Sequence, residues 1–315
     1  MAQLIKLQDY ISRYEQNIFV YSSRFVTLKK KNWKRFYFSR KKAGFAQASG
    51  LDFDFSESRE KSKVSLFRKM ANFCRRKRGG TEPASPAHFP PGHEETSRSV
   101  FNRNRPVQDD ELKRRFLDEI FPLQLKWASA TLTEMSFVDN RFYRDPLLKY
   151  FLQRFPDNFF VLYKPVFMVK TAPVETESIL ITPTDVWCLS FLEYEDNAVY
   201  FCTADRFWLK KVGRREENVL NPLPALNRTE KIVKNILEKH ASDLSIHKVV
   251  LSRNGYFDIL FAPPGTRFID KKQYESWFQT MRAHSSPVKH AQLAAARALL
   301  EHCRTQAVPR PEWRY

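Results

Sequence analysis

The sequence predicts an α/β (α+β) fold in which a small mixed sheet is flanked by helices. Short β-rich runs separated by turn residues fill the segment from Glu175 to Pro222. Runs of this length and composition are typical of paired strands, so strands are predicted at 179–181, 186–192 and 198–202. These three runs are expected to form one continuous meander.

A helix and a further strand complete the predicted core. Asn221-Pro222 leads into a helical pattern from about 224 to 240, and the β-branched run 247–251 follows it. Further strands are predicted at 159–163, 166–169 and 256–261. Apolar residues at three- and four-residue spacing predict additional helices. These are 2–20, 109–132, 146–155, 271–282 and 291–303.

Composition divides the chain into segments. Hydrophobic periodicity disappears between 43 and 106, where Pro, Ser, Glu and Gly are frequent, and this is typical of a flexible linker. The predicted organisation is a basic amphipathic helical arm, a linker, an α/β domain, C-terminal helices and a loose tail. Their expected bounds are 1–42, 43–106, 107–265, 266–304 and 305–315.

The chain has 315 residues and a formal net charge of +18. Residues 1–106 contain 23 Lys and Arg against 9 Asp and Glu, whereas the other 209 residues contain 30 against 26. A basic partner surface is therefore expected in the N-terminal third. No apolar run reaches the ~18–20 residues that span a bilayer, and the start lacks a secretory signal pattern. The four cysteines form no CxxC pair, so a cytoplasmic protein is predicted.

Residues 24–42 contain nine basic side chains and no acidic one, interleaved with aromatic residues. Cations beside aromatic rings can follow phosphates and stack on bases. The nucleic-acid-binding candidates here are Lys29, Lys30, Lys31, Lys34, Arg35, Arg40, Lys41 and Lys42. A second set, Arg206, Lys210 and Lys211, lies beside Trp208. A solvated helix face with its aromatic residues packed inward is the alternative, and an anionic membrane surface would attract the same residues.

Familiar catalytic motifs are missing. The seven histidines show no HExxH spacing, and the sequence contains no GxSxG, GxGxxG or P-loop pattern. Neither a metal ion nor an organic cofactor is therefore predicted from these motifs.

Four segments in order carry a resemblance to a known family. They are ESILITPTDVWCLSFLE, RFWLKK, NPLPALNRTEKIVKNIL and HKVVLSRNGYFD. Over about 143–260 the chain resembles the NERD family, the nuclease-related domain grouped with the PD-(D/E)XK nucleases. The resemblance implies a restriction-endonuclease-like fold. It also implies divalent-metal chemistry in which two carboxylates hold Mg²⁺ against the scissile phosphate and a lysine assists the attacking water.

The residues that such chemistry needs are replaced in this sequence. On the family pattern, the first acid falls at Glu177, the second acid at Ser190, the lysine at Leu192, and a frequent glutamine at Ala225. Asp145 is the nearest match to an upstream glutamate. Glu193, next to Leu192, should point to the opposite face of an extended strand. These replacements indicate a nuclease scaffold without nuclease activity.

Three functions follow as hypotheses. The first is a catalytically inactive NERD-like protein that binds nucleic acid or a protein partner through the domain and the basic arm. The second is a peripheral membrane or scaffold protein whose arm binds anionic lipid. The third is a nuclease that uses Glu177 and Mg²⁺ with non-standard ligands. The oligomeric state is not predicted.

Overall fold

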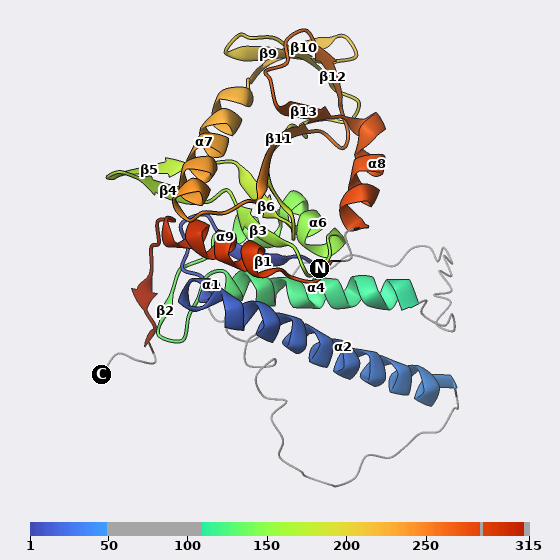
Figure 1. The fold of residues 1–315 in the computed structure, drawn as a ribbon. Helices are drawn as coiled ribbons and strands as arrows, with labels where there is room; N and C mark the ends of the chain where they lie inside the picture. Colours follow the sequence, from blue (N-terminus) through green and yellow to red (C-terminus); the bar gives the residue numbers. More distant parts are fainter. Residues whose placement is uncertain (49–108, 284–285, 312–315) are drawn as a thin grey trace, which may run out of the picture. The chain divides into compact units, whose positions relative to one another are not determined.

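The computed structural model describes residues 1–48, 109–283 and 286–311, with side chains up to residue 40 in the first range. The chain divides into two units, one of Met1–Tyr37 with Gln108–Tyr315 and one of Phe38–Val107. Only the end of one helix is described in the second unit, so the fold below is that of the first (Figure 1). Within the described ranges, no helix combines the length and the apolar character needed to cross a membrane.

A six-stranded mixed sheet forms the centre of the first unit. Its strand order is β1-β3-β6-β7-β11-β13. The middle strands β3, β6 and β7 are successively antiparallel, while β11 and β13 run parallel to β7 and β1 runs parallel to β3. The strand bounds are β1 Gln3–Leu7, β3 Phe160–Tyr163, β6 Ser178–Ile181, β7 Asp185–Phe191, β11 Ser245–Leu251 and β13 Thr266–Ile269.

Helices cover both faces of this sheet, which explains why its strands are apolar at nearly every position. Alternate residues of β7 enter different clusters: Cys188 packs with α7 and α9, whereas Leu189 packs with α6 and α8. In Figure 1, α7 and α8 accordingly flank the sheet on opposite sides. The bounds are α6 Pro146–Arg154, α7 Leu223–Lys239, α8 Lys271–Arg282 and α9 His290–Glu301.

A second sheet of four strands has the order β10-β9-β8-β12. The bounds are β8 Val199–Cys202, β9 Phe207–Val212, β10 Arg215–Leu220 and β12 Tyr256–Ile259. The inward side chains Tyr200 and Trp208 are fully buried, and the indole of Trp208 donates to the Thr203 carbonyl at 2.9 Å. The predicted continuous meander is therefore wrong at its third run. β7 pairs with β6 and β11, and β8 begins this separate sheet.

The predicted helix at 2–20 is also wrong. Residues 3–7 form β1, which is buried at every position beside β3, so its apolar residues serve both faces of the sheet. Short α1 (Arg13–Gln16) follows, with Ser12 as its capping residue, and α2 begins at Ile18. The arm at 1–42 is consequently not a separate segment, because residues 1–37 belong to the main unit.

The other predicted elements are largely confirmed. Asp145 caps α6 by accepting from the backbone N–H groups of Leu147 and Leu148, both at 3.0 Å. α4 (Asp109–Trp127) continues through Pro122 without division. Residues 43–48 extend α2, and the rest of the predicted linker lies outside the described residues. The remaining elements are α2 Ile18–Ala48, α5 Asn140–Tyr143, β2 Glu134–Met135, β4 Val166–Val169, β5 Ala172–Glu175 and β14 Val308–Pro309.

The predicted loose tail is held by pairing in its first part. β14 pairs antiparallel with β2, joining Val308 to Met135. The Gln306 backbone also donates to the Asp9 carbonyl at 2.7 Å. The C-terminal helices 266–304 and this part of the tail thus belong to the same unit as the α/β core.

Candidate functional site

Charged residues collect at one edge of the six-stranded sheet. The carboxyl ends of β3, β7 and β11 meet there because these strands run in the same direction, and antiparallel β6 starts at the same edge. Lys164 follows β3, Glu177 precedes β6, Glu193 lies just beyond β7, and Arg253 lies just beyond β11. Open α/β sheets commonly bind ligands outside the carboxyl ends of their strands. This edge is therefore the candidate site.

Glu177 lies beside Ser190. The β6–β7 register pairs Ser178 with Leu189, so the next position out joins Glu177 to Ser190. The Ser190 hydroxyl donates to the Glu177 carboxylate. The backbone N–H of Glu177 donates at 2.9 Å to Thr229 of α7, and this bond fixes the start of β6 on the helix.

Burial raises the pKa of the Glu177 carboxyl above its ordinary value. The positive charges of Lys164 and Arg228 and the hydrogen bond from Ser190 act in the opposite direction and do not cancel the effect of burial. Glu177 is thus a half-buried carboxyl near two cations, with a serine rather than a second acid beside it.

The two other replaced positions lie close by. Leu192 is 3% exposed and packs in the core cluster on the α7 side of the sheet. Ala225 accepts through its carbonyl from the Thr229 hydroxyl at 2.9 Å, and that same hydroxyl receives the Glu177 N–H. The structure therefore brings Glu177, Ser190 and Ala225 together and places Leu192 directly after the end of β7.

These residues do not fit a divalent metal ion of the nuclease type. Such an ion takes several oxygen ligands with carboxylates prominent among them, whereas Ser190 offers a neutral hydroxyl and Leu192 offers no polar atom. Among the side chains that the structure describes, no group of three or more His, Cys, Asp or Glu residues is arranged to hold a metal ion.

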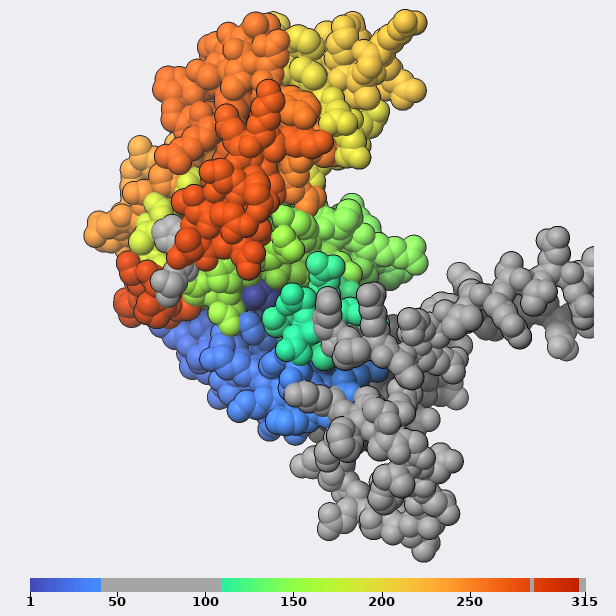
Figure 2. Space-filling model, turned by 90° about the vertical axis from the view of Figure 1, so that its right-hand side faces the viewer, coloured from blue at the N-terminus to red at the C-terminus, as the bar shows by residue number. Residues whose placement is uncertain are grey.

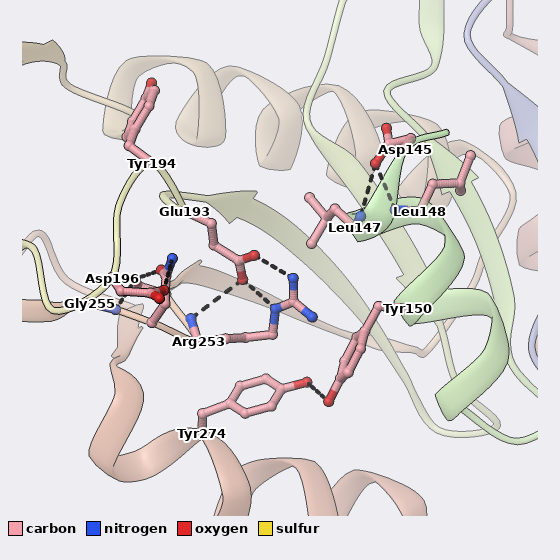
Figure 3. Close-up of polar contacts among 12 residues, drawn as sticks. Asp145, Leu147, Leu148, Tyr150, Glu193, Tyr194, Asp196, Arg253, Gly255 and Tyr274 are labelled. Carbon is pink, nitrogen blue, oxygen red and sulfur yellow. Dashed lines mark hydrogen bonds and ion pairs between the residues drawn. The ribbon is translucent and has the colours of Figure 1, made fainter. Parts of the chain in front are cut away.

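Asp145 has a structural role at this edge. One carboxylate oxygen caps α6, and the other accepts from the Tyr163 hydroxyl at 2.7 Å. Burial and then the Asp145 charge raise the pKa of Tyr163, and the charges of Glu193 and Glu177 add to the effect. Asp145 is thus already occupied by protein donors on both oxygens, as Figure 3 shows for the cap.

Glu193 and Arg253 form an ion pair that the sequence analysis missed. Arg253 donates through Nε at 2.6 Å and through a terminal nitrogen at 2.5 Å, one bond to each carboxylate oxygen (Figure 3). The guanidinium lies 4.1 Å from the centre of the Tyr150 ring, whose hydroxyl accepts from Tyr274 at 3.0 Å. Although burial acts to lower it, the pKa of Arg253 is raised by the hydrogen bonds and charge of Glu193. Both carboxylate oxygens of Glu193 therefore accept hydrogen bonds from Arg253.

A signal for this pair was present in the sequence. Glu193 lies one residue and Arg253 two residues beyond a predicted strand, and parallel strands place such residues at one edge. The prediction failed because β7 was expected to pair with β8 and not with β11.

The basic residues of α2 divide into two groups. Lys29 is 15% exposed and pairs with Asp157 at 2.6 Å, so its ammonium group already has a partner within the protein and its role as a phosphate contact stays a prediction. Lys30, Lys31, Lys34 and Arg35 are exposed, and the described residues provide none of them with an ion-pair partner. Arg40 is exposed in the second unit, and the side chains of Lys41 and Lys42 lie outside the described part of the chain.

Three aromatic residues of α2, Phe25, Trp33 and Phe36, pack inward, whereas Phe38 is 61% exposed. Phe25 is fully buried, and Phe36 is 9% exposed. The rings of Trp33 and Phe36 both contact Phe116 of α4, with centroids 5.1 and 5.7 Å from it. The first part of α2 therefore combines an exposed basic face with inward-facing rings, and the rings of Phe25, Trp33 and Phe36 are not available to stack on bases.

The second predicted basic set is largely neutralised. Lys210 is 4% exposed and pairs with Glu195 at 2.9 Å and Glu217 at 2.7 Å. Lys211 pairs with Glu216 at 3.0 Å. Antiparallel β9 and β10 place acids opposite Lys210 and Lys211, so both already have ion-pair partners, and their role as phosphate contacts stays a prediction. Arg206 is exposed and stacks over Phe207.

A cavity of about 480 Å³ lies between α1, the start of α2 and α9. Its carboxylates already have partners: Glu15 accepts from buried Lys6 and from Thr305, and Glu301 pairs with Arg297 at 2.7 Å. Both carboxylates that line the cavity, Glu15 and Glu301, are therefore already paired within the protein.

Comparison with known proteins gives one partial similarity. The chain is 33% identical over 128 residues to an RNA 2',3'-cyclic phosphodiesterase of Geobacillus stearothermophilus. The match covers 39% of this chain and 36% of that protein, so the chain spans little more than a third of the relative. No family model matches the chain, and no solved structure matches it.

Proposed function

We propose that this chain contains a NERD-like, restriction-endonuclease-like scaffold that has lost metal-dependent phosphodiester cleavage and binds nucleic acid. The element order α6, β3, β6, β7, α7, β11, with three antiparallel strands followed by a helix and a parallel strand, is what the resemblance implies. The absence of cleavage activity is inferred from one observation: Glu177 lies beside Ser190, and Leu192 is buried in the core. One carboxylate without a second acid or a lysine on β7 leaves a metal too few ligands.

The proposed binding surface is the exposed basic face of α2. Lys30, Lys31, Lys34 and Arg35 lie within six residues of one helix, which corresponds to an axial rise of ~7.5 Å. Duplex nucleic acid presents about four phosphate charges over that length. Because Phe25, Trp33 and Phe36 point inward, contact is limited to phosphates and should depend little on base sequence.

RNA is the first nucleic acid to test. The Geobacillus relative is named as an RNA 2',3'-cyclic phosphodiesterase, and it is 33% identical to this chain over 128 residues. This name does not identify the ligand of α2. A DNA duplex of the same length should therefore be tested in the same experiment.

The test is fluorescence anisotropy with labelled RNA and DNA duplexes at several salt concentrations. The variant Lys30→Gln, Lys31→Gln, Lys34→Gln should weaken binding to both duplexes at least tenfold and lower the dependence of log K on log salt by about 2–3. The matched control removes three exposed lysines of α7, by Lys231→Gln, Lys234→Gln and Lys239→Gln. The control has the same net charge as the variant and should bind like the wild type.

If both triple variants lost the same affinity for the duplexes, binding would depend on net charge alone and the proposed surface on α2 would be wrong. Absence of binding by the wild type at low salt would overturn it. The membrane alternative predicts that vesicles with anionic lipid compete with the duplex. α2 supplies only electrostatic attraction to such vesicles because its apolar face is buried in the protein.

The nuclease alternative predicts nicking of plasmid DNA with Mg²⁺ or Mn²⁺ that is lost in Glu177→Ala. The proposal predicts the same plasmid pattern for wild type and variant. Cleavage that depends on Glu177 would overturn the inactive assignment while leaving the binding surface on α2 intact, so the two parts of the proposal fail separately.

A further inference from the structure

Arg13 and Arg310 lie close together without an acidic partner. Arg13 is the first residue of α1, and Arg310 directly follows β14. The Nε atom of each guanidinium is buried and has no hydrogen-bond acceptor among the described residues. Glu134 lies opposite Pro309 in the pairing of β2 with β14, yet within the described ranges it forms no ion pair with Arg310. Two half-buried guanidinium groups with unused donors therefore lie side by side.

The two positive charges act on one another. Burial lowers the pKa of Arg13, and the charge of Arg310 acts in the same direction. An arginine side chain nevertheless keeps its proton in a protein, so both groups stay charged. A buried donor without an acceptor and two neighbouring like charges are both unfavourable. A negatively charged group with several acceptor oxygens would relieve both.

Hydrogen bonds among three segments hold the backbone around the two arginines. The Ile11 N–H donates to the Ser136 hydroxyl at 2.8 Å, and that hydroxyl donates to the Gln306 carbonyl at 2.5 Å. The Arg310 N–H donates to the Thr133 carbonyl at 2.8 Å. The fold therefore fixes the two arginines relative to one another before any ligand binds.

The Arg13 side chain lies over an aromatic ring. Its guanidinium carbon is 5.0 Å from the centre of the Trp127 ring. That ring packs edge to face with Phe25 and Tyr21, at 5.4 and 6.0 Å between centroids, and Trp127 is 7% exposed. The indole thus positions the guanidinium through a cation–π contact, and it exposes too little of its ring for a nucleobase to stack on it.

We propose that Arg13 and Arg310 form a binding site for a phosphate group. A guanidinium donates pairs of parallel hydrogen bonds to phosphate oxygens, and two such groups can bind a tetrahedral anion from two sides. A phosphate monoester carries a charge of about −1.5 to −2 at pH 7, which balances the two arginines, whereas one carboxylate supplies a single charge and two oxygens. The ligand is therefore a phosphate dianion, either free or as a monoester.

This site is separate from the surface that we propose for nucleic acid. Arg13 precedes α2, and Lys30 lies 12 residues after Ile18, the first residue of α2, which is ~18 Å along the helix axis. α1 and β2 lie on the left of Figure 1, whereas Figure 2 is viewed from the right and shows the later part of α2 in blue. Binding of phosphate here and binding of nucleic acid on α2 can therefore fail independently.

Isothermal titration calorimetry of the full chain with inorganic phosphate tests this proposal, with chloride holding the ionic strength constant. The wild type should bind phosphate at one site with a Kd on the order of 0.1–1 mM, as suits so small a ligand. Arg13→Gln and Arg310→Gln should each raise the Kd about tenfold or more. Acetate should bind the wild type about tenfold more weakly than phosphate, because it brings a single charge and two oxygens.

Two controls remove positive charge elsewhere. Arg141→Gln changes an arginine that lies 4.8 Å over the Phe142 ring and pairs with Asp139 at 3.3 Å, and it should bind phosphate like the wild type. The triple lysine variant of α2 should also bind phosphate like the wild type. Phenyl phosphate identifies the source of the ligand: tighter binding than inorganic phosphate assigns the site to monoesters, weaker binding assigns it to free phosphate, and both uphold the phosphate group.

Thermal midpoints in phosphate-free buffer separate loss of the site from loss of the fold. Arg310→Gln should keep or raise the midpoint, because it removes one of two like charges. A fall of more than ~3 °C would mean that Arg310 already has a partner within the protein, and it would overturn the proposal. A wild type that binds no phosphate up to ~20 mM, unchanged affinity in Arg13→Gln, or equal loss in Arg141→Gln would overturn it as well.

Discussion

Glu177 is a carboxyl whose surroundings oppose its ionisation. Burial raises its pKa, and neighbouring Lys164 only partly compensates. A carboxyl whose pKa is higher in the folded state binds its proton more tightly there than in the unfolded chain. Stability is therefore lost as the pH rises from the unfolded pKa through the folded pKa.

Glu177→Gln should consequently raise the thermal midpoint at pH 7–8. The amide keeps an acceptor for Ser190 and removes the buried charge. An increase of ~1–4 °C is expected, and it should shrink toward pH 4, where Glu177 is protonated in the folded protein. Scanning calorimetry at both pH values measures the effect. A decrease at pH 7 would show that the Glu177 charge is stabilised by Lys164 and Arg228 more than burial penalises it.

The ion pair of Glu193 and Arg253 should matter more than an exposed one. Their side chains are 13% and 22% exposed. Arg253→Gln leaves the Glu193 charge without its partner and should cost about 2–4 kcal/mol of unfolding free energy. The control Arg297→Gln breaks a pair with Glu301 whose side chains are 65% and 46% exposed, and it should cost ~0.3–0.5 kcal/mol.

Urea denaturation of both variants makes this comparison. Glu193→Gln combined with Arg253→Gln should be more stable than Arg253→Gln alone, because the unpaired charge is removed as well. Equal losses for Arg253→Gln and Arg297→Gln would mean that the pair at the sheet edge contributes no more than a surface contact.

At the scale of elements, β1 decides whether the first residues are an arm or part of the core. Ile5 is fully buried in the strand beside β3. Ile5→Ala should lower the unfolding free energy by ~2–5 kcal/mol, the usual range for truncating a buried isoleucine.

The matched control for β1 is Val20→Ala in α2, where the side chain is 37% exposed. This change should stay within about 0.5 kcal/mol of the wild type. If the N-terminal residues were an independent arm, both substitutions would leave the unfolding of the α/β core unchanged. Urea denaturation followed by tryptophan fluorescence distinguishes the two cases.

Several elements were predictable because their signals are local. Asp145-Pro146 predicts the start of α6 through capping and proline geometry, and Asn221-Pro222 similarly precedes α7. The strand at 3–7 was not predictable in this way. Leu4, Leu7 and Ile11 match a helical spacing by chance, and only pairing with β3, more than 150 residues away, makes this segment a strand.

The same distinction applies to the candidate site. The replacements at Ser190 and Leu192 can be seen in the sequence, since their chemistry depends only on residue type. The pairing of Lys210 with Glu195 and Glu217 cannot, because cross-strand register joins these residues. The ion pair between Glu193 and Arg253 likewise required the knowledge that β7 lies beside β11.

At the scale of the whole molecule, the structure assigns its surfaces different characters. The chain has a formal net charge of +18, and the fold leaves Lys30, Lys31, Lys34 and Arg35 exposed as the surface that we propose for nucleic acid. The sheet edge around Glu177 holds paired groups, so the proposed binding functions lie away from the position of the missing chemistry.

The sequence by itself determined the α/β class, the position of most helices and strands, the concentration of charge in the N-terminal third, and the residue types Ser190 and Leu192 at the positions discussed above. These properties depend on residue type and short-range spacing. Tertiary structure alone decided that residues 3–7 join the central sheet, that β8 leaves it, and which lysines remain unpaired. Those outcomes depend on contacts between residues far apart in the chain, and the energy of such contacts has no local signature.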